Sequence, residues 1–323
     1  MRRFVLQSLV LGLTICVTAS GQDRSQGQAE RKRVNLSADT FTGIDSAGTS
    51  VQMLIGNVRL RQEETRLRAD RATQYPDRDE ILFVGNVVVF ERGDTLLADR
   101  VLYNRTSKIG RAFGSVRLTD GDVIVTAPSA VYNTRTKRTD FEDGVTLVDS
   151  ASVLVSNTGT YWSESKQAAF AGNVRLRNDD ASVLADSVDY DRETEVSRAA
   201  GNVFVYTVDA DTSSVTAVVA DWAFNDRRSG AERLRGNVLL FQVRFDSSSV
   251  DTLVMKSRAL RIEKSDTLDQ MWATGDVRIW NMETSATADS VRYESVDRGG
   301  VRHETIHMFV SPVAWFESSQ IYG

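Results

Sequence analysis

Apolar and polar residues alternate with a period of two through most of this chain. For example, Val174 and Leu176 fall on one face of an extended segment, and Arg175 and Arg177 fall on the other. Because successive side chains of a strand point to opposite sides, this alternation predicts half-buried β-strands. Short polar clusters such as Asn104–Ser107 lie between the alternating segments and predict tight turns. After the N-terminal segment no window has the apolar spacing of a helix, so we expect an all-β fold of antiparallel strands.

The alternating segment returns along the chain at a nearly constant interval. Gly-Asn-Val or a close variant begins at six positions 29 residues apart, and two looser copies follow after 35 and 39 residues. The copies begin at Gly56, Gly85, Gly114, Asp143, Gly172, Gly201, Gly236 and Gly275. A second motif, usually Ala-Asp, also recurs along the chain. Its second position is held in turn by Asp70, Asp99, Pro128, Asn157, Asp186, Asp221 and Asp289, which we call the aspartate column, and in most copies a tyrosine follows four residues later. Such periodicity predicts an array of 29-residue repeats, each made of a strand, a turn, a second strand and a turn.

The recurrent glycine lies inside strand-like sequence. Glycine weakens a strand unless a bend or bulge requires it, so its recurrence predicts that every strand bends at the same height. The alternative is a glycine that only ends a hairpin loop. An array of bent strands makes a V-shaped open trough or a flattened barrel, in which each repeat is stabilised by its neighbours. The first and last strands of such an array have unpaired edges that can bind another chain.

The inner face of this array is the candidate binding surface. A lipid tail that leaves water for such a surface gains about 0.8 kcal/mol per buried CH₂ group, without any polar contact. The predicted groove residues are Val58, Leu60, Val87, Val89, Val116, Leu118, Val145, Leu147, Val174, Leu176, Val203 and Val205. The alternative is that these side chains only fill a closed core.

Composition limits the classes of function. The chain has 323 residues, of which 41% are hydrophobic, and can bury a substantial core. It carries 39 basic and 44 acidic residues, for a net charge of -5, and the two signs are interspersed. Nothing in this balance favours a nucleic acid as partner. Repeat spacing predicts a regular array over residues 34–208 and a continuation with longer repeats over residues 209–323.

The two ends of the chain have distinct features. Residues 1–21 combine Arg2 and Arg3 with an apolar segment and small residues, which predicts a cleaved signal peptide. Cys16 also allows a lipoprotein interpretation, although Ile15 stands where a small residue normally precedes the modified cysteine. Residues 22–33 are polar and predict a flexible leader. The last residues resemble the opening of one more repeat, so the sequence is either a fragment or ends on a bare strand edge.

Two patterns suggest chemistry of another kind. His303 and His307 belong to a literal H-E-x-x-H, which binds zinc when it lies on a helix. Here Gly300 and Pro312 flank a strand-like run, and on a strand the two histidines would be about 13 Å apart. The aspartate column could also suggest a carbohydrate-cleaving or calcium-binding array, but Pro128 and Asn157 interrupt it. We interpret these aspartates as solvent-facing or turn-capping residues, and we expect no catalytic residue, metal or cofactor.

The Gly-Asn-Val-x-Leu and Ala-Asp-x-Val-x-Tyr motifs, after a signal peptide, resemble the OstA-like domains of the lipopolysaccharide-transport (Lpt) family, which includes LptA, LptC and the periplasmic part of LptD. The resemblance covers residues 34–323. It implies a bent β-jellyroll whose apolar interior holds the acyl chains of lipopolysaccharide. It also implies strand edges that join to other Lpt proteins, or head to tail to further copies, in a bridge between the two membranes. The chain is longer than the short bridge proteins of that family.

These observations lead to one expected function and two alternatives. We expect a non-enzymatic periplasmic protein that binds the lipid A part of lipopolysaccharide and serves outer-membrane assembly, with energy supplied by an ATPase elsewhere. The first alternative is a secreted structural or adhesive β-repeat protein without lipid cargo. The second is a β-helix enzyme acting on polysaccharides, whose activity would depend on one or two aspartates of the column.

Overall fold

The computed structural model describes residues 35–322 except for residues 47–48, 63–64, 92–93, 120, 122, 134, 149–151, 163–164, 179–180, 192, 209–213, 246–249, 265–267, 282, 299–300 and 317–318. The predicted signal peptide and leader lie outside the described residues. The chain divides into two compact units, Met1–Ser150 with Thr158–Lys166 and Ala151–Asn157 with Gln167–Gly323. The boundary predicted at residues 208/209 rests on repeat length and stays a prediction. Within the described part, no helix is long and apolar enough to cross a membrane.

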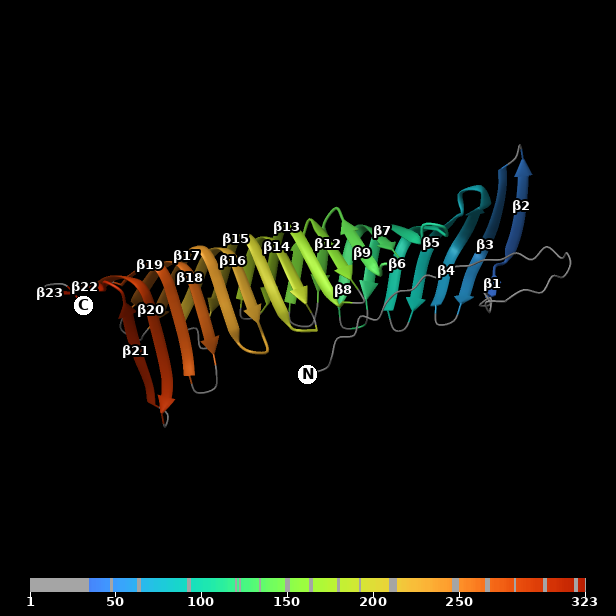
Figure 1. Cartoon of the computed structure of the whole chain (residues 1–323). Coiled ribbons are helices and arrows are strands. Elements are labelled where there is room, and N and C mark those ends of the chain that lie inside the picture. Colours follow the sequence, from blue (N-terminus) through green and yellow to red (C-terminus); the bar gives the residue numbers. More distant parts are fainter. Residues whose placement is uncertain are drawn as a thin grey trace, which may run out of the picture. The chain divides into compact units, whose positions relative to one another are not determined.

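The first unit consists of antiparallel strands and one short 3₁₀ helix (Figure 1). Its elements are β1 (Asn35–Ser37), β2 (Thr40–Ser46), β3 (Thr49–Gln62), β4 (Thr65–Tyr75), η1 (Pro76–Arg78), β5 (Glu80–Glu91), β6 (Asp94–Asn104), β7 (Ile109–Thr119), β8 (Ile124–Asn133), β9 (Arg138–Glu142), β10 (Val145–Val148) and β12 (Thr158–Trp162). Strands β3 to β8 pair in sequence order. Both β1 and β2 pair with β3, both β9 and β10 pair with β8, and β12 pairs with β9.

The second unit is built in the same way. Its strands are β11 (Ser152–Ser156), β13 (Gln167–Asn178), β14 (Ala181–Asp191), β15 (Val196–Val208), β16 (Ser214–Asp226), β17 (Ala231–Phe245), β18 (Val250–Lys264), β19 (Leu268–Trp280), β20 (Thr284–Arg298), β21 (Val301–Phe309), β22 (Val313–Phe316) and β23 (Ser319–Tyr322). Strands β13 to β20 pair in sequence order, and β11 pairs with β13. Both β21 and β22 pair with β20, and β23 pairs with β22. The all-β prediction, with antiparallel hairpins following one another, is therefore confirmed.

The recurrent Gly-Asn pair forms a β-bulge inside the strand. In β13 the pairing with β14 jumps from Ala171 to Val174, and the residues between them, Gly172 and Asn173, have φ of +79° and +51°. The same jump and the same pair of positive φ angles recur at Gly56, Gly85, Gly114, Gly201, Gly236 and Gly275. A bulge bends the strand that carries it. This confirms that the glycine marks a bulge and does not merely end a hairpin loop.

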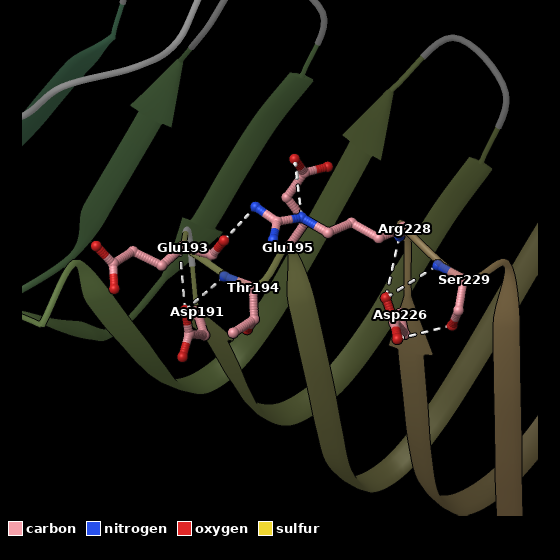
Figure 2. A network of polar contacts seen from close by, with 7 residues as sticks. All are labelled: Asp191, Glu193, Thr194, Glu195, Asp226, Arg228 and Ser229. Carbon is pink, nitrogen blue, oxygen red and sulfur yellow. Dashed lines mark hydrogen bonds and ion pairs between the residues drawn. The ribbon is translucent and has the colours of Figure 1, made fainter.

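Two hairpin turns of the second unit, one between β14 and β15 and the other between β16 and β17, are joined by side chains (Figure 2). Asp191 accepts hydrogen bonds from the backbone N–H groups of Glu193 and Thr194, at 3.0 Å each. In the turn between β16 and β17, Asp226 accepts 3.0 and 3.3 Å bonds from the N–H groups of Arg228 and Ser229 and a 2.7 Å bond from the Ser229 hydroxyl. Arg228 donates to the Glu193 carbonyl of the turn between β14 and β15. The carboxylates therefore hold each turn, and the arginine links the two.

These turns predict a loss of stability in acid. The Ser229 hydroxyl and the backbone N–H of Ser229 lower the pKa of Asp226, and the N–H of Thr194 lowers the pKa of Asp191. A carboxyl with a lowered pKa in the folded state stabilises the protein above its unfolded pKa, and this contribution is lost as pH falls through the folded pKa. We therefore expect the free energy of unfolding to fall below about pH 4.

The measurement is urea unfolding of wild type and Asp226→Asn at pH 7 and pH 3. The variant should be less stable than wild type at pH 7, and the difference should shrink at pH 3. Asp251→Asn, which changes an exposed aspartate outside these turns, is the control. A difference between wild type and Asp226→Asn that is equal at both pH values would contradict the prediction.

Candidate functional site

The residues beside the bulges form a buried row on the inside of each bend, which we call the bend row. Each valine of Gly-Asn-Val lies opposite a small residue of the neighbouring strand. The pairs are Val58–Ala69, Val87–Ala98 and Val116–Ala127 in the first unit, and Val174–Ala185, Val203–Ala220, Val238–Ser257 and Val277–Ala288 in the second. Every one of these valines is at most 1% exposed. A larger side chain opposite a smaller one favours close packing at the bend.

At four of the bulges, a hydrogen bond between the two motifs closes the outer side of the bend. The side-chain amide of Asn202 donates to Asp186 Oδ2 at 2.9 Å, and Asn237 donates to Asp221 Oδ2 at 3.0 Å. The same bond joins Asn86 to Asp70 at 2.9 Å. The aspartates of the column are exposed, so their interpretation as solvent-facing residues is confirmed. Where the hydrogen bond is present, the aspartate caps a bulge and not a turn.

The aspartate also explains why the first residue of the bulge is glycine. A Cβ atom added at Gly201 would lie 2.2 Å from Asp186 Oδ2, and one added at Gly236 would lie 2.2 Å from Asp221 Oδ2. Where the column holds Pro128, the facing motif is reversed to Asp143-Gly144, and a Cβ at Gly144 would meet nothing within 4 Å. At this place the strand is split into β9 and β10. The two sequence motifs therefore meet in one structural unit, a bulge with an aspartate packed against its glycine. This unit changes where either motif is replaced.

A second apolar row lies two residues further from the bend. In the first unit it crosses β3 to β8 in register and reaches β10, through Leu60, Leu67, Val89, Leu96, Leu118, Val125 and Leu147. All but the last are at most 8% exposed, and Leu147 is half-buried. This row is therefore closed over most of the first unit and becomes accessible at β10.

The corresponding row of the second unit is more open. It runs in register through Leu154, Leu176, Val183, Val205, Val218, Leu240, Met255, Ile279 and Ala286. Leu176, Val183 and Val205 are half-buried, whereas Met255 is 1% exposed. The whole row is apolar, so it offers an uncharged surface that a hydrocarbon can reach at β13 to β15. We call both second rows the inner row.

The twelve predicted groove residues fall into two classes. Val58, Val87, Val116, Val174 and Val203 belong to the bend row, and Val145 has the same repeat position at the start of β10. Each is at most 1% exposed, so these side chains have no surface free for a ligand. The inner row contains Leu60, Val89, Leu118, Leu147, Leu176 and Val205. Of these, Leu147, Leu176 and Val205 keep surface that a ligand could contact. All twelve point inward, and their contact with a ligand stays a prediction.

Sequence reasoning missed one half of both rows. The partners in the Ala-Asp strands, such as Leu67, Leu96 and Val183, contribute as much to the inner row as the predicted residues do. The sequence could have identified these residues, because each stands two positions before the alanine of Ala-Asp. The dipeptide Ala38-Asp39 was also missed, and Asn57 donates a 2.9 Å bond to Asp39.

The H-E-x-x-H segment lies on a strand. His303 and His307 belong to β21 and pair with Val296 and Arg292 of β20. Four residues along a strand separate the two Cα atoms by about 13 Å, which is too far for one ion. Within the described ranges no group of three or more potential ligands is arranged to hold a metal. The prediction of a strand at this segment is confirmed.

Part of this chain is similar to known proteins. Residues 31–186 match the family model described as OstA-like protein. A solved structure that is similar to part of the chain is the crystal structure of LptH, described as the LptA homologous periplasmic component of the conserved lipopolysaccharide transport device from Pseudomonas aeruginosa. The two share 13% identity over 42% of this chain and 82% of that chain, with a TM-score of 0.21. A search of the curated proteins gave no significant match.

Proposed function

Because residues 31–186 match the model of the OstA-like family, we propose that this chain is a periplasmic carrier of lipopolysaccharide that holds the acyl chains of lipid A in an open, trough-shaped apolar interior. It would be exported by the signal peptide predicted at residues 1–21 and would act in outer-membrane assembly. Its role would be to bind and pass on cargo, without catalysing a reaction.

The observation that carries this proposal is the inner row of the second unit. A row of apolar side chains in register from β11 to β20 is far longer than one small ligand requires, and its half-buried members Leu176, Val183 and Val205 are adjacent. Each CH₂ group moved from water onto such a surface contributes about 0.8 kcal/mol. Several acyl chains could therefore be bound without any specific polar contact.

The same architecture supports the proposed partners. Strands at the ends of a sheet leave backbone N–H and C=O groups that can pair with a strand of another chain. We propose that these edges bind other Lpt-type β-jellyroll proteins, or further copies of this chain head to tail. Movement of cargo along such a bridge would need energy from an ATPase elsewhere, since binding to an apolar row has no direction of its own.

The test is photocrosslinking in living cells from a photoreactive residue at Leu176 or Val205. Both positions should give adducts with lipid A, because their side chains lie in the inner row. Arg59 and Arg117 are the matched controls, since each stands three residues after the glycine of its repeat, with an exposed side chain on the outer face of the first unit. They should give no lipid A adduct.

Absence of lipid A adducts at Leu176 and Val205, with the protein folded and exported, would contradict the proposal. If depletion of the protein also left outer-membrane assembly intact, the structural or adhesive alternative would be supported. Adducts of equal yield from Arg117 and Leu176 would show that contact with lipid is not confined to the interior.

A further inference from the structure

The outer face of the second unit carries a large apolar area that the proposed interior does not use. Two rows, which we call the outer patch, cross β14 to β19 on the side opposite the inner row. The first row is Leu184, Phe204, Val219 and Leu239, and the second is Tyr206, Ala217, Phe241, Val254 and Trp280, each paired in register with the next. Leu184, Val219 and Phe241 are 42–43% exposed. Contiguous apolar surface of this kind marks an interaction site.

The corresponding outer positions of the first unit are different. There the first row reads Arg59, Arg68, Val88, Leu97, Arg117 and Thr126. The second row places Phe90 between Arg66 and Thr95. Strands that are apolar on one face only suit a sheet with one face in water, whereas strands apolar on both faces suit a sheet that is covered on both. The second unit thus has a face that needs a cover, and the first unit does not.

The charges around the outer patch indicate what covers it. Arg175 precedes Leu184 in the first row, and Lys256 and Arg278 follow Leu239. Arg177 lies beside the start of the second row, next to Ser182. All four side chains are exposed. Asp186 and Asp221 lie at the bend beside the first row, where Asn202 and Asn237 donate hydrogen bonds to their carboxylates, and Asp276 forms an ion pair with Arg258.

We propose that the outer patch of the second unit lies against an anionic lipid surface. Aliphatic and aromatic side chains would enter the boundary between headgroups and acyl chains, and the cationic residues at both ends of the rows would contact lipid phosphates. Tyr206 and Trp280 have the amphipathic rings that suit this boundary. The proposal concerns the outer face and does not depend on what the interior carries.

A second copy of this chain fits the patch less well. Both ends of the first row are cationic, so two outer patches packed face to face would bring arginine or lysine against arginine or lysine in either alignment. Like charges placed opposite each other destabilise an interface. An anionic lipid surface, in contrast, complements both ends at once.

The experiment is flotation of the full chain without its signal peptide on vesicles of phosphatidylglycerol and phosphatidylcholine, and on vesicles of phosphatidylcholine alone. Wild type should float with the anionic vesicles, and binding should weaken as salt is raised. Phe241→Glu should reduce binding to the anionic vesicles about tenfold or more, because it places a charge where an apolar ring would be buried. Phe90→Glu is the matched control, since Phe90 has the same repeat position and is 38% exposed in the first unit. It should bind as wild type does.

Several outcomes would overturn the proposal. One is failure of the folded wild type to bind anionic vesicles, and another is equal loss of binding in Phe241→Glu and Phe90→Glu. A third is a concentration-dependent dimer in sedimentation that Phe241→Glu abolishes, which would assign the patch to self-association. Lys256→Glu gives an independent variant. It should weaken binding to anionic vesicles at low salt while leaving the melting temperature unchanged.

Discussion

Val203→Asp should unfold the second unit or destabilise it by about 3–5 kcal/mol, the cost of an uncompensated buried charge. Val203 is 0% exposed and lies opposite Ala220 at the bend between β15 and β16. The members of the bend row offer this carboxylate no charged partner. The substitution would also remove the stabilisation that comes from burying the valine side chain.

The measurement is urea unfolding followed by circular dichroism. Phe204→Asp is the control, because it adds the same charge one residue further along the strand on the outer face. It should cost far less than Val203→Asp, since its carboxylate stays in contact with water. Equal destabilisation by the two substitutions would show that the alternation of inner and outer faces has been assigned wrongly.

Gly201→Ala should have the next largest effect. Gly201 has φ of +74°, a conformation that costs an L-residue about 1–2 kcal/mol. The added Cβ would also lie 2.2 Å from Asp186 Oδ2 and 2.8 Å from Asp186 Cβ, so rotation of the aspartate side chain alone cannot remove the clash. We expect a total destabilisation of about 2–4 kcal/mol, because overpacking adds about 1–3 kcal/mol to the backbone cost.

Gly144→Ala separates the two causes. Gly144 also has a positive φ, of +101°, but a Cβ at this position would meet nothing within 4 Å. This variant should therefore lose only the backbone contribution, and thermal unfolding should show a smaller decrease than for Gly201→Ala. If both variants lost the same stability, the contact between glycine and aspartate would not be the reason for glycine at the bulge.

The fold could be predicted from the sequence to a large extent. Val174 and Leu176 alternate with Arg175 and Arg177, and in the structure Val174 is buried while both arginines are exposed. The recurrent glycine inside such segments predicted a bulge, because few other residues adopt a positive φ without cost. Both signals are local, since they depend on neighbouring residues of one strand.

The candidate site could be predicted only in part. The valines and leucines of the Gly-Asn-Val strands were found, but Leu67 and Val183 of the partner strands were not. Exposure separates Val174 at 1% from half-buried Leu176 two residues away, and no local pattern distinguishes them. How far a side chain is covered depends on strands from other repeats and on its distance from the bend.

By itself, the sequence determined the strands, their two faces and the place of each bulge, because these follow from the chemistry of successive residues. Only the tertiary structure decided that Asn202 bonds Asp186, 16 residues earlier, and that the aspartate and glycine motifs meet in one structural unit. It also decided which inner residues stay accessible and that Phe204, Val219 and Leu239 join into one outer surface. The physical reason is that hydrogen-bonded register brings residues of different strands together, and register is a property of the folded sheet.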